Sequence, residues 1–124
     1  MKKINCCITG VNGFAGSNLI DYFLKKKKKL IGIARRRSKV KNTNYTFFKN
    51  DLTKSFTNQL NKYSIDWFIH SAAHHKIKDF KYKPEKKKEY NQNMVNNIID
   101  LCIKRKIKNL IFFSTIDINY YPLN

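Results

Sequence analysis

Short apolar runs alternate with segments of helical periodicity along this chain. The apolar runs predict buried parallel strands, and they span residues 4–9, 30–34, 45–48, 66–70 and 109–114. The helical segments predict a first helix over residues 14–28, a short helix from Thr53 or Ser55 to about Tyr63, and a long helix from Pro84 to about Lys106.

This alternation of strand and helix predicts a parallel sheet with right-handed crossover connections. We therefore expect an α/β fold with a doubly wound parallel sheet, truncated after its fifth strand. The long helix has apolar residues at helical spacing and is expected to bury Met94, Ile98, Leu101 and Cys102. No repeat or linker interrupts the pattern, which indicates a single and incomplete domain over residues 1–124.

A glycine-rich turn separates the first predicted strand from the first helix. It reads Thr-Gly-Val-Asn-Gly-Phe-Ala-Gly over residues 9–16 and holds three of the four glycines in the chain. At this spacing Gly10 allows a tight turn, Gly13 lets a phosphate approach the backbone, and Gly16 lets the helix pack closely on the sheet. Free N–H groups at the helix N-terminus favour an anion. The turn is therefore interpreted as a phosphate-binding loop, the alternative being a loop that merely holds three glycines.

Small and polar residues follow the other predicted strands. They are the arginines at 35–37, Asp51, residues 71–73, and Ser114 with Thr115. The carboxyl ends of parallel strands meet at one edge of a sheet, and doubly wound sheets bind ligands there, where the strand order reverses. We therefore expect these residues and the glycine-rich loop to form one site.

The loop spacing and the fourth strand resemble a known family. Thr-Gly-x-x-Gly-Phe-x-Gly-x-x-Leu over residues 9–19 resembles the opening of the NAD(P)-dependent epimerase/dehydratase family, the extended short-chain dehydrogenases that act on nucleotide sugars. Residues 67–73 read Trp-Phe-Ile-His-Ser-Ala-Ala, similar to the family's strand ending in His-x-Ala-Ala. The resemblance covers essentially the whole chain but only the cofactor half of the enzyme. It implies a Rossmann-type domain.

The resemblance also implies roles for individual residues. The loop glycines would hold the pyrophosphate, Asp51 would contact the adenine amino group, and Ala72 and Ala73 would let the backbone approach the cofactor. The other cofactor contacts expected from the family pattern are Asn12, Phe14, Leu52, Asn93 and Ser114. For Asp51 the alternative is a helix-capping carboxylate. Asn93 opens the segment Asn-Met-Val-Asn-Asn, in which the family's Gly and Thr are replaced.

Cations follow the second strand, where NAD-binding domains commonly carry a carboxylate. This strand ends at Ala34, and Arg35, Arg36 and Arg37 come next. Guanidinium groups suit a ribose 2′-phosphate, whereas Asp or Glu suits the free ribose hydroxyls. We therefore expect NADP or NAD as the cofactor, with NADP favoured and with Arg35 and Arg36 at the phosphate. The alternative is that the arginines belong to a general excess of basic residues.

The segment after the fifth strand carries the candidate catalytic hydroxyl. Phe-Phe-Ser-Thr over residues 112–115 resembles the family's Ser-Thr segment, which implies that Thr115 bonds the reacting sugar oxygen, with Ser114 as the next candidate. No Tyr-x-x-x-Lys pair, the family's acid/base element, follows Thr115. We expect this chain to be the NAD(P)-binding portion of a nucleotide-sugar epimerase, dehydratase or reductase, and to be inactive alone. Hydride transfer to and from the sugar is expected only in a full-length parent.

The chain is strongly basic, with 26 Lys and Arg against 8 Asp and Glu and a formal net charge of +18. Because the lysines accompany many Asn and Ile residues throughout, they indicate compositional drift rather than a binding patch. We therefore expect non-specific RNA binding but no specific nucleic-acid partner. The alternative function is a non-catalytic nucleotide- or RNA-binding module that uses the same cleft.

The remaining features indicate a cytoplasmic protein without metal. Cys6, Cys7 and Cys102 form no paired framework and are interpreted as reduced thiols. The histidines at 70, 74 and 75 lack acidic or thiolate partners at ligand spacing, so no metal site is expected. No apolar segment suits a membrane span, and we expect no membrane partner. An open sheet edge after the fifth strand favours association into a homo-oligomer.

Overall fold

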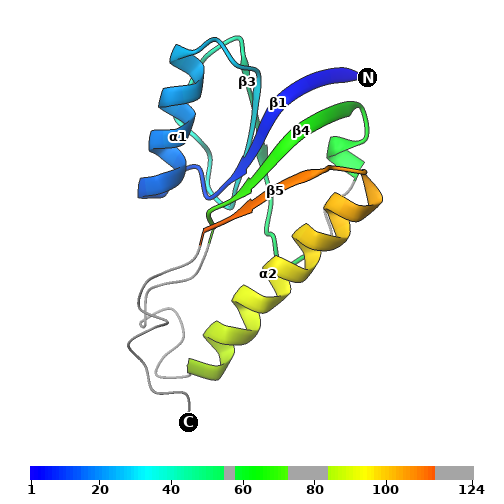
Figure 1. Ribbon diagram of the computed structural model, residues 1–124. Helices are drawn as coiled ribbons and strands as arrows, with labels where there is room; N and C mark the ends of the chain where they lie inside the picture. The colour runs from blue at the N-terminus through cyan, green and yellow to red at the C-terminus, as the bar shows by residue number, and fades with distance from the viewer. Residues whose placement is uncertain (55–57, 73–83, 114–124) are drawn as a thin grey trace.

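The computed structural model describes residues 1–54, 58–72 and 84–113 (Figure 1). The strands are β1 (Lys2–Thr9), β2 (Leu30–Ala34), β3 (Tyr45–Lys49), β4 (Tyr63–His70) and β5 (Asn109–Phe112). The helices are α1 (Phe14–Lys25), the short 3-10 helix η1 (Asn58–Leu60) and α2 (Pro84–Lys104). All five predicted strands and both longer predicted helices are present.

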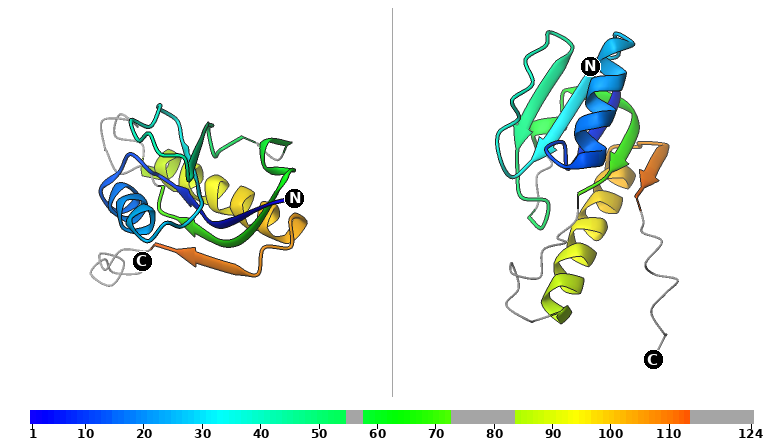
Figure 2. Two further views of the ribbon diagram at one scale, coloured as in Figure 1. Left: turned by 90° about the horizontal axis from the view of Figure 1, so that it is seen from above. Right: turned by 90° about the vertical axis from the view of Figure 1, so that its left-hand side faces the viewer.

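The strands form one parallel sheet in the order β3-β2-β1-β4-β5. Helix α1 packs on one face of this sheet and α2 on the other, as the two views of Figure 2 show. The direction of strand addition reverses between β1 and β4. Doubly wound sheets bind ligands at the carboxyl ends of the strands on either side of such a reversal. The expected α/β fold with a parallel, doubly wound sheet is therefore confirmed.

Two apolar cores lie on the two faces of the sheet. Neighbouring strand residues point to opposite faces, so Cys6 packs on the α1 side and Cys7 on the α2 side. The residues expected to be buried by the long helix are buried in the α2 core: Met94, Ile98, Leu101 and Cys102. Burial raises the pKa of Cys6 to about 12 and that of Cys102 to about 11, so both are thiols at neutral pH.

The core on the α1 side depends on a glycine within β2. The ring of Tyr45 on β3 lies across Gly32, and a Cβ built on Gly32 would overlap the tyrosine ring and hydroxyl. Both residues are buried. The aromatic ring thus fills the space that a side chain on β2 would otherwise occupy.

The prediction of a helix from Thr53 or Ser55 to about Tyr63 is wrong. The described part of this connection holds only the three-residue η1, and Tyr63 is already the first residue of β4. A local turn replaces the start of the expected helix, because the carboxylate of Asp51 accepts hydrogen bonds from both the backbone and the hydroxyl of Thr53. Ser55 lies outside the described residues.

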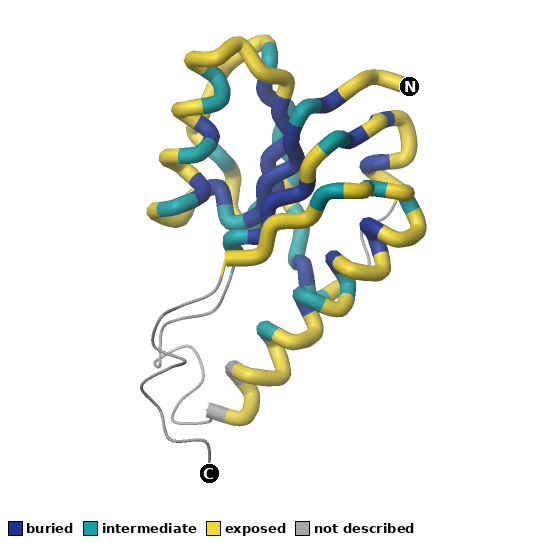
Figure 3. The backbone as a smooth tube through the Cα atoms, in the orientation of Figure 1, coloured by how far each residue is buried: buried dark blue, intermediate teal, exposed yellow. Residues whose placement is uncertain are grey.

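Exposed apolar side chains gather on β5, the outer strand of the described sheet. They belong to Leu110, Ile111 and Phe112 of β5 and to Phe113, which follows it, with Trp67 of β4 beside them. Figure 3 shows this strand as exposed along most of its length. Within the described residues, no helix is long and apolar enough to cross a membrane.

Arg105 joins the end of α2 to the start of β4. Its Nη2 atom donates to the carbonyl oxygens of Leu60 at 2.8 Å, Asn61 at 2.9 Å and Tyr63 at 3.1 Å. Its Nη1 atom donates to Oδ1 of Asn61 at 3.3 Å. One guanidinium group thus pairs with carbonyls of η1, of the following turn and of the first residue of β4.

Replacement of Arg105 by alanine is expected to lower the free energy of unfolding by about 2–3 kcal/mol, because several carbonyls lose a charged donor. Urea unfolding followed by circular dichroism measures this. The neighbouring Lys104→Ala is the control and should change stability by less than about 0.5 kcal/mol, since Lys104 is exposed. Equal effects of the two substitutions would show that Arg105 does not anchor the helix.

Candidate functional site

The glycine-rich loop leaves β1 at Gly10, which the fold requires to be glycine. Gly10 has a positive φ of 68°, a conformation that disfavours other residues. A Cβ at this position would also lie 2.8 Å from the backbone nitrogen of Ala72. The Gly10 N–H donates to the carbonyl of Ile33 at 3.0 Å, and its own carbonyl accepts from the Gly13 N–H at 3.0 Å. The loop is therefore fixed against both β2 and the chain after β4.

Gly16 and Gly13 differ in what surrounds them. A Cβ on Gly16 would overlap the carbonyl oxygen of Gly10, so Gly16 allows the close packing of α1 on the loop. A Cβ on Gly13 would meet only that same carbonyl oxygen, at 3.3 Å. Gly13 has an extended backbone, with φ −81° and ψ 174°, that any residue can adopt. Glycine at 13 therefore avoids a tight contact with the Gly10 carbonyl oxygen and keeps the loop backbone accessible, without any strained dihedral angle.

The N-terminus of α1 begins at the exposed Gly13 and presents its backbone there. Gly13 is the N-cap residue, no side chain caps the helix, and its first turn holds no acidic residue. The side chains of Ser17 and Asn18 bond instead to the carbonyl oxygen of Phe14. Unpaired N–H groups and the positive end of the helix dipole therefore form an anion-binding position.

Two contacts hold the ends of β1, β2 and β3 together at this edge. The side-chain amide of Asn12 donates to the carbonyl of Arg36 at 2.8 Å. The Asn50 N–H donates to the carbonyl of Ala34 at 2.9 Å. The side chains of Arg35 and Arg36 are exposed. The arginine segment is thus bonded directly to the glycine-rich loop.

Asp51 is ionised at neutral pH. Burial by itself would raise its pKa, but hydrogen bonds from Thr53 and the positive charges of Lys54 and Arg35 outweigh burial and lower the pKa below its usual value. Both bonds from Thr53 go to Oδ1, at 2.7 and 3.0 Å. The next residue, Leu52, has a buried side chain, and its carbonyl accepts from Nδ2 of Asn97 at 2.8 Å.

The hydroxyl of Thr9 ties the carboxyl ends of β1 and β4 together. Its Oγ1 accepts from the backbone N–H of Ser71 at 3.1 Å and of Ala72 at 3.3 Å, and it lies 2.8 Å from Nδ1 of His70. The Ser71 hydroxyl donates in return to the Thr9 carbonyl. Because Oγ1 already accepts two bonds, we assign its proton to the bond with His70. That assignment makes Nδ1 the acceptor and places the imidazole proton on Nε2.

His70 is buried as a neutral imidazole. Only 1% of its surface is exposed, and its ring stacks on Phe112 of β5 with 5.6 Å between ring centroids. Its Nε2 atom is buried and has no partner among the described residues. Burial lowers the pKa of His70 to about 4.

The structure brings most of the sequence-predicted cofactor residues to one edge. The glycine-rich loop, the arginine segment, Asp51 and Ala72 all lie there, whereas Asn93 is exposed along α2. Ala73, Ser114 and Thr115 lie outside the described residues, and their expected roles stay predictions. The sequence did not single out Thr9 or Asn97. The described residues contain no cluster of His, Cys, Asp or Glu able to hold a metal.

Acidification is expected to destabilise the fold through His70. The unfolded imidazole has a pKa of 6.5 and the folded one about 4, so between these values the unfolded chain takes up a proton that the folded chain excludes. The contribution of the neutral His70 to the free energy of unfolding is therefore complete above about pH 6.5 and is lost as the pH falls to about 4. The shift corresponds to about 3 kcal/mol. Urea unfolding at stepped pH measures it.

His70→Asn is the matched control for this pH dependence, because asparagine keeps an acceptor for Thr9 and does not titrate in this range. Its free energy of unfolding should fall less than that of the unchanged chain over the same pH interval. Identical pH dependence in the two proteins would show that His70 contributes nothing to it.

Comparison with known proteins agrees with this geometry. Residues 6–122 match the model of the NAD dependent epimerase/dehydratase family. No curated protein sequence matches the chain.

Solved structures share the fold. UDP-glucose 4-epimerase from Thermotoga maritima, solved with UDP-glucose, has a TM-score of 0.78 and 23% identity, covering 90% of this chain and 38% of that one. WbmG from Bordetella bronchiseptica, solved with NAD, has a TM-score of 0.77 and 20% identity, covering 93% and 38%. UDP-N-acetylglucosamine 4-epimerase from Methanobrevibacter ruminantium M1, solved with UDP-N-acetylmuramic acid, has a TM-score of 0.75 and 26% identity, covering 94% and 39%. This chain thus spans somewhat over a third of their length.

From the match of the family model over nearly all of its residues, the chain belongs to the NAD-dependent epimerase/dehydratase family.

Proposed function

We propose that this chain is the NAD(P)-binding portion of an enzyme that epimerises, dehydrates or reduces a nucleotide sugar. The observation that carries the proposal is the uncapped N-terminus of α1 at the exposed Gly13, where the backbone has no side chain over it. A pyrophosphate fits this position because it needs both close backbone approach and unpaired N–H donors. Related structures solved with NAD and with UDP-sugars support the choice of ligand class.

The residues present fit a dinucleotide along the carboxyl edge of the sheet. The loop amides and the first turn of α1 would hold the pyrophosphate, and the ionised Asp51 would accept a hydrogen bond from the adenine amino group. The bond from Asn12 to Arg36 keeps the segment that would bind the ribose next to the pyrophosphate position. The bound nicotinamide would supply the hydride acceptor and donor. The fixed loop and strand ends would orient it.

NADP is the cofactor that the charges favour. The end of β2 carries no carboxylate for the free ribose hydroxyls. Arg35 and Arg36 are exposed, and the backbone of Arg36 is bonded to Asn12 of the loop. A 2′-phosphate gains charge-assisted hydrogen bonds from guanidinium groups. The sugar-facing hydroxyl is assigned to Thr115, with Ser114 as second candidate, on the family resemblance alone.

The chain is expected to bind NADPH more tightly than NADH. In Arg35→Gln/Arg36→Gln, NADPH affinity should fall by about tenfold, as expected for losing a charge-assisted contact, while NADH affinity changes little. Isothermal titration with each cofactor measures both constants. Lys26→Gln/Lys28→Gln removes the same charge beyond the far end of α1 and should leave the preference unchanged. Tighter binding of NADH by the unchanged chain would overturn the assignment.

Two glycine substitutions separate cofactor binding from folding. Gly13→Val should fold, at a cost of about 1–2 kcal/mol from the poorer N-cap and the tight contact of its Cβ with the Gly10 carbonyl oxygen, and should lose both cofactors because its side chain fills the pyrophosphate position. Gly16→Ala should instead destabilise the fold by about 3 kcal/mol or more through overlap with Gly10. Thermal unfolding and isothermal titration on both variants test this. Undiminished cofactor binding by folded Gly13→Val would contradict the proposed site.

A further inference from the structure

Lysines gather at the amino edge of the sheet, opposite the glycine-rich loop. The segments that lead into β1, β2, β4 and β5 all meet at this edge, since the strands are parallel. Their exposed lysines, here named the amino-edge lysines, are Lys2, Lys26, Lys27, Lys28, Lys29, Lys62, Lys104, Lys106 and Lys108. In Figure 1 this edge runs from the turn after α1 to the N-terminus and the end of α2.

The strand register arranges these lysines as an elongated surface. Leu30, Cys6, Trp67 and Asn109 lie level across β2, β1, β4 and β5. Lys29 and Lys108 therefore stand at the two sides of this row, three strand spacings or about 14 Å apart. Lys2 and Lys62 project beyond it at the tip of the β1–β4 pair, where Lys2 pairs with Tyr63. The charges thus extend across the sheet rather than around one point.

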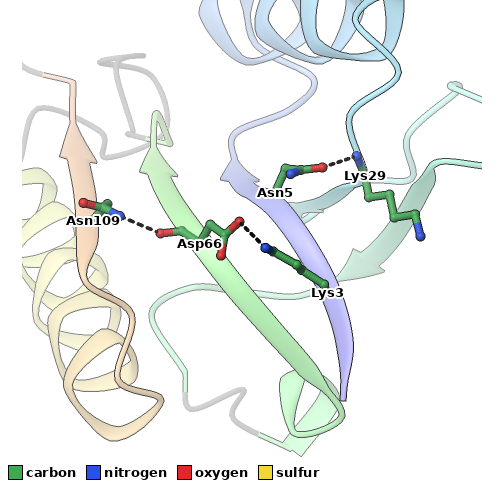
Figure 4. A network of polar contacts seen from close by, with 5 residues as sticks. All are labelled: Lys3, Asn5, Lys29, Asp66 and Asn109. Atoms are coloured by element: carbon green, nitrogen blue, oxygen red, sulfur yellow. Dashed lines mark hydrogen bonds and ion pairs between the residues drawn. The ribbon is translucent and has the colours of Figure 1, made fainter.

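Acidic residues do not neutralise this surface. Residues 26–29, 61–62 and 104–108 contain no Asp or Glu. The ion pairs of the described residues are Lys3 with Asp66 at 3.9 Å and Lys25 with Asp21 at 3.0 Å, and neither uses an amino-edge lysine. Figure 4 shows Asp66 directed at Lys3, while the ammonium of Lys29 extends away from the contacts of its own backbone. The uncompensated charge therefore faces solvent.

The lysine-bearing turns are held in place by side-chain contacts to the backbone. Oδ1 of Asn5 accepts from the Lys29 N–H at 2.9 Å, and Nδ2 of Asn109 donates to the Asp66 carbonyl at 3.0 Å (Figure 4). The bonds of Arg105 to the start of β4 fix the turn after α2. Fixed turns lower the entropy cost of presenting several cations to one ligand.

Helix electrostatics account for only part of this pattern. Cations are favoured near the C-termini of α1 and α2, but Lys2 and Lys62 follow neither helix. Both helices end in a Schellman motif whose left-handed residue is a lysine, Lys27 and Lys106, each with φ 56°. Glycine is the usual residue there, and a side chain costs roughly 1 kcal/mol. The chain carries charge at this edge at positions where glycine would stabilise the fold.

We propose that the amino-edge lysines bind the phosphate backbone of single-stranded nucleic acid. A linear polyanion matches an elongated row of fixed cations, because each phosphate can meet a separate lysine. The exposed ring of Tyr22 has the Nζ of Lys26 over one face, 5.7 Å from the ring centroid, and offers its remaining exposed surface to an unstacked base. This surface lies across the sheet from the proposed cofactor edge, so the inference goes beyond the proposed function.

The substitutions Lys27→Gly and Lys106→Gly, made together, test the surface without weakening the fold. They remove two charges and place the preferred residue at both left-handed positions. Binding of a fluorescent single-stranded RNA of about 12 nucleotides is followed by anisotropy between low and physiological salt. The variant should bind several-fold more weakly at physiological salt, and the slope of log K against log salt should become shallower by about 1.4, or 0.7 for each lost phosphate contact.

Two variants with the same charge change locate the binding surface. Lys86→Gln/Lys88→Gln alters the exposed start of α2, and Arg35→Gln/Arg36→Gln alters the cofactor edge. Both should keep nearly the full affinity and salt slope. Equal weakening of all three variants would show binding by net charge alone, and a larger loss in the arginine variant would place binding in the cofactor cleft. If the Lys27→Gly/Lys106→Gly variant lost binding to phosphatidylserine vesicles but bound RNA unchanged, the lysines would form a membrane-binding surface. Each of these outcomes overturns the proposal.

Discussion

Three backbone segments meet around Gly10 with no room for a side chain between them. The end of β1, the start of α1 and the residues after β4 approach so closely that a Cβ on Gly10 or Gly16 would overlap a neighbouring backbone. The Thr9 hydroxyl bonds this junction from the β4 side through Ser71 and Ala72. The position of the glycine-rich loop therefore depends on the pairing of β1 with β4, not on the loop sequence alone.

The two edges of the sheet use positive charge in different ways. At the carboxyl edge the charge comes mainly from the backbone, as unpaired amides and the dipole of α1, and it is directed at one small volume. At the amino edge it comes from flexible ammonium groups that extend across several strands. One basic composition thus yields a confined anion site on one side and a broad cationic surface on the other.

Features set by neighbouring residues followed from the sequence, and features set by distant residues did not. The strands and the glycine-rich loop each depend on a short continuous pattern, and so does the buried stripe of α2. The helix expected from Thr53 failed because hydrogen bonds between Asp51 and Thr53 form a competing turn, which propensity alone does not distinguish from a cap. The bond of Thr9 to His70 joins residues 61 positions apart, and the carbonyls bound by Arg105 become neighbours only once the strands are in register.

The close contact of Tyr45 with Gly32 links the evolution of two strands. Neither residue is assigned a contact with the cofactor, yet any side chain on Gly32 must displace the aromatic ring that covers it. A larger residue at 32 is thus acceptable only after Tyr45 has become smaller. In the reverse order, a smaller residue at 45 first leaves a cavity against the bare backbone of β2. Homologous chains should therefore exchange these two positions as a pair, and an engineer who redesigns this face must treat them as one unit.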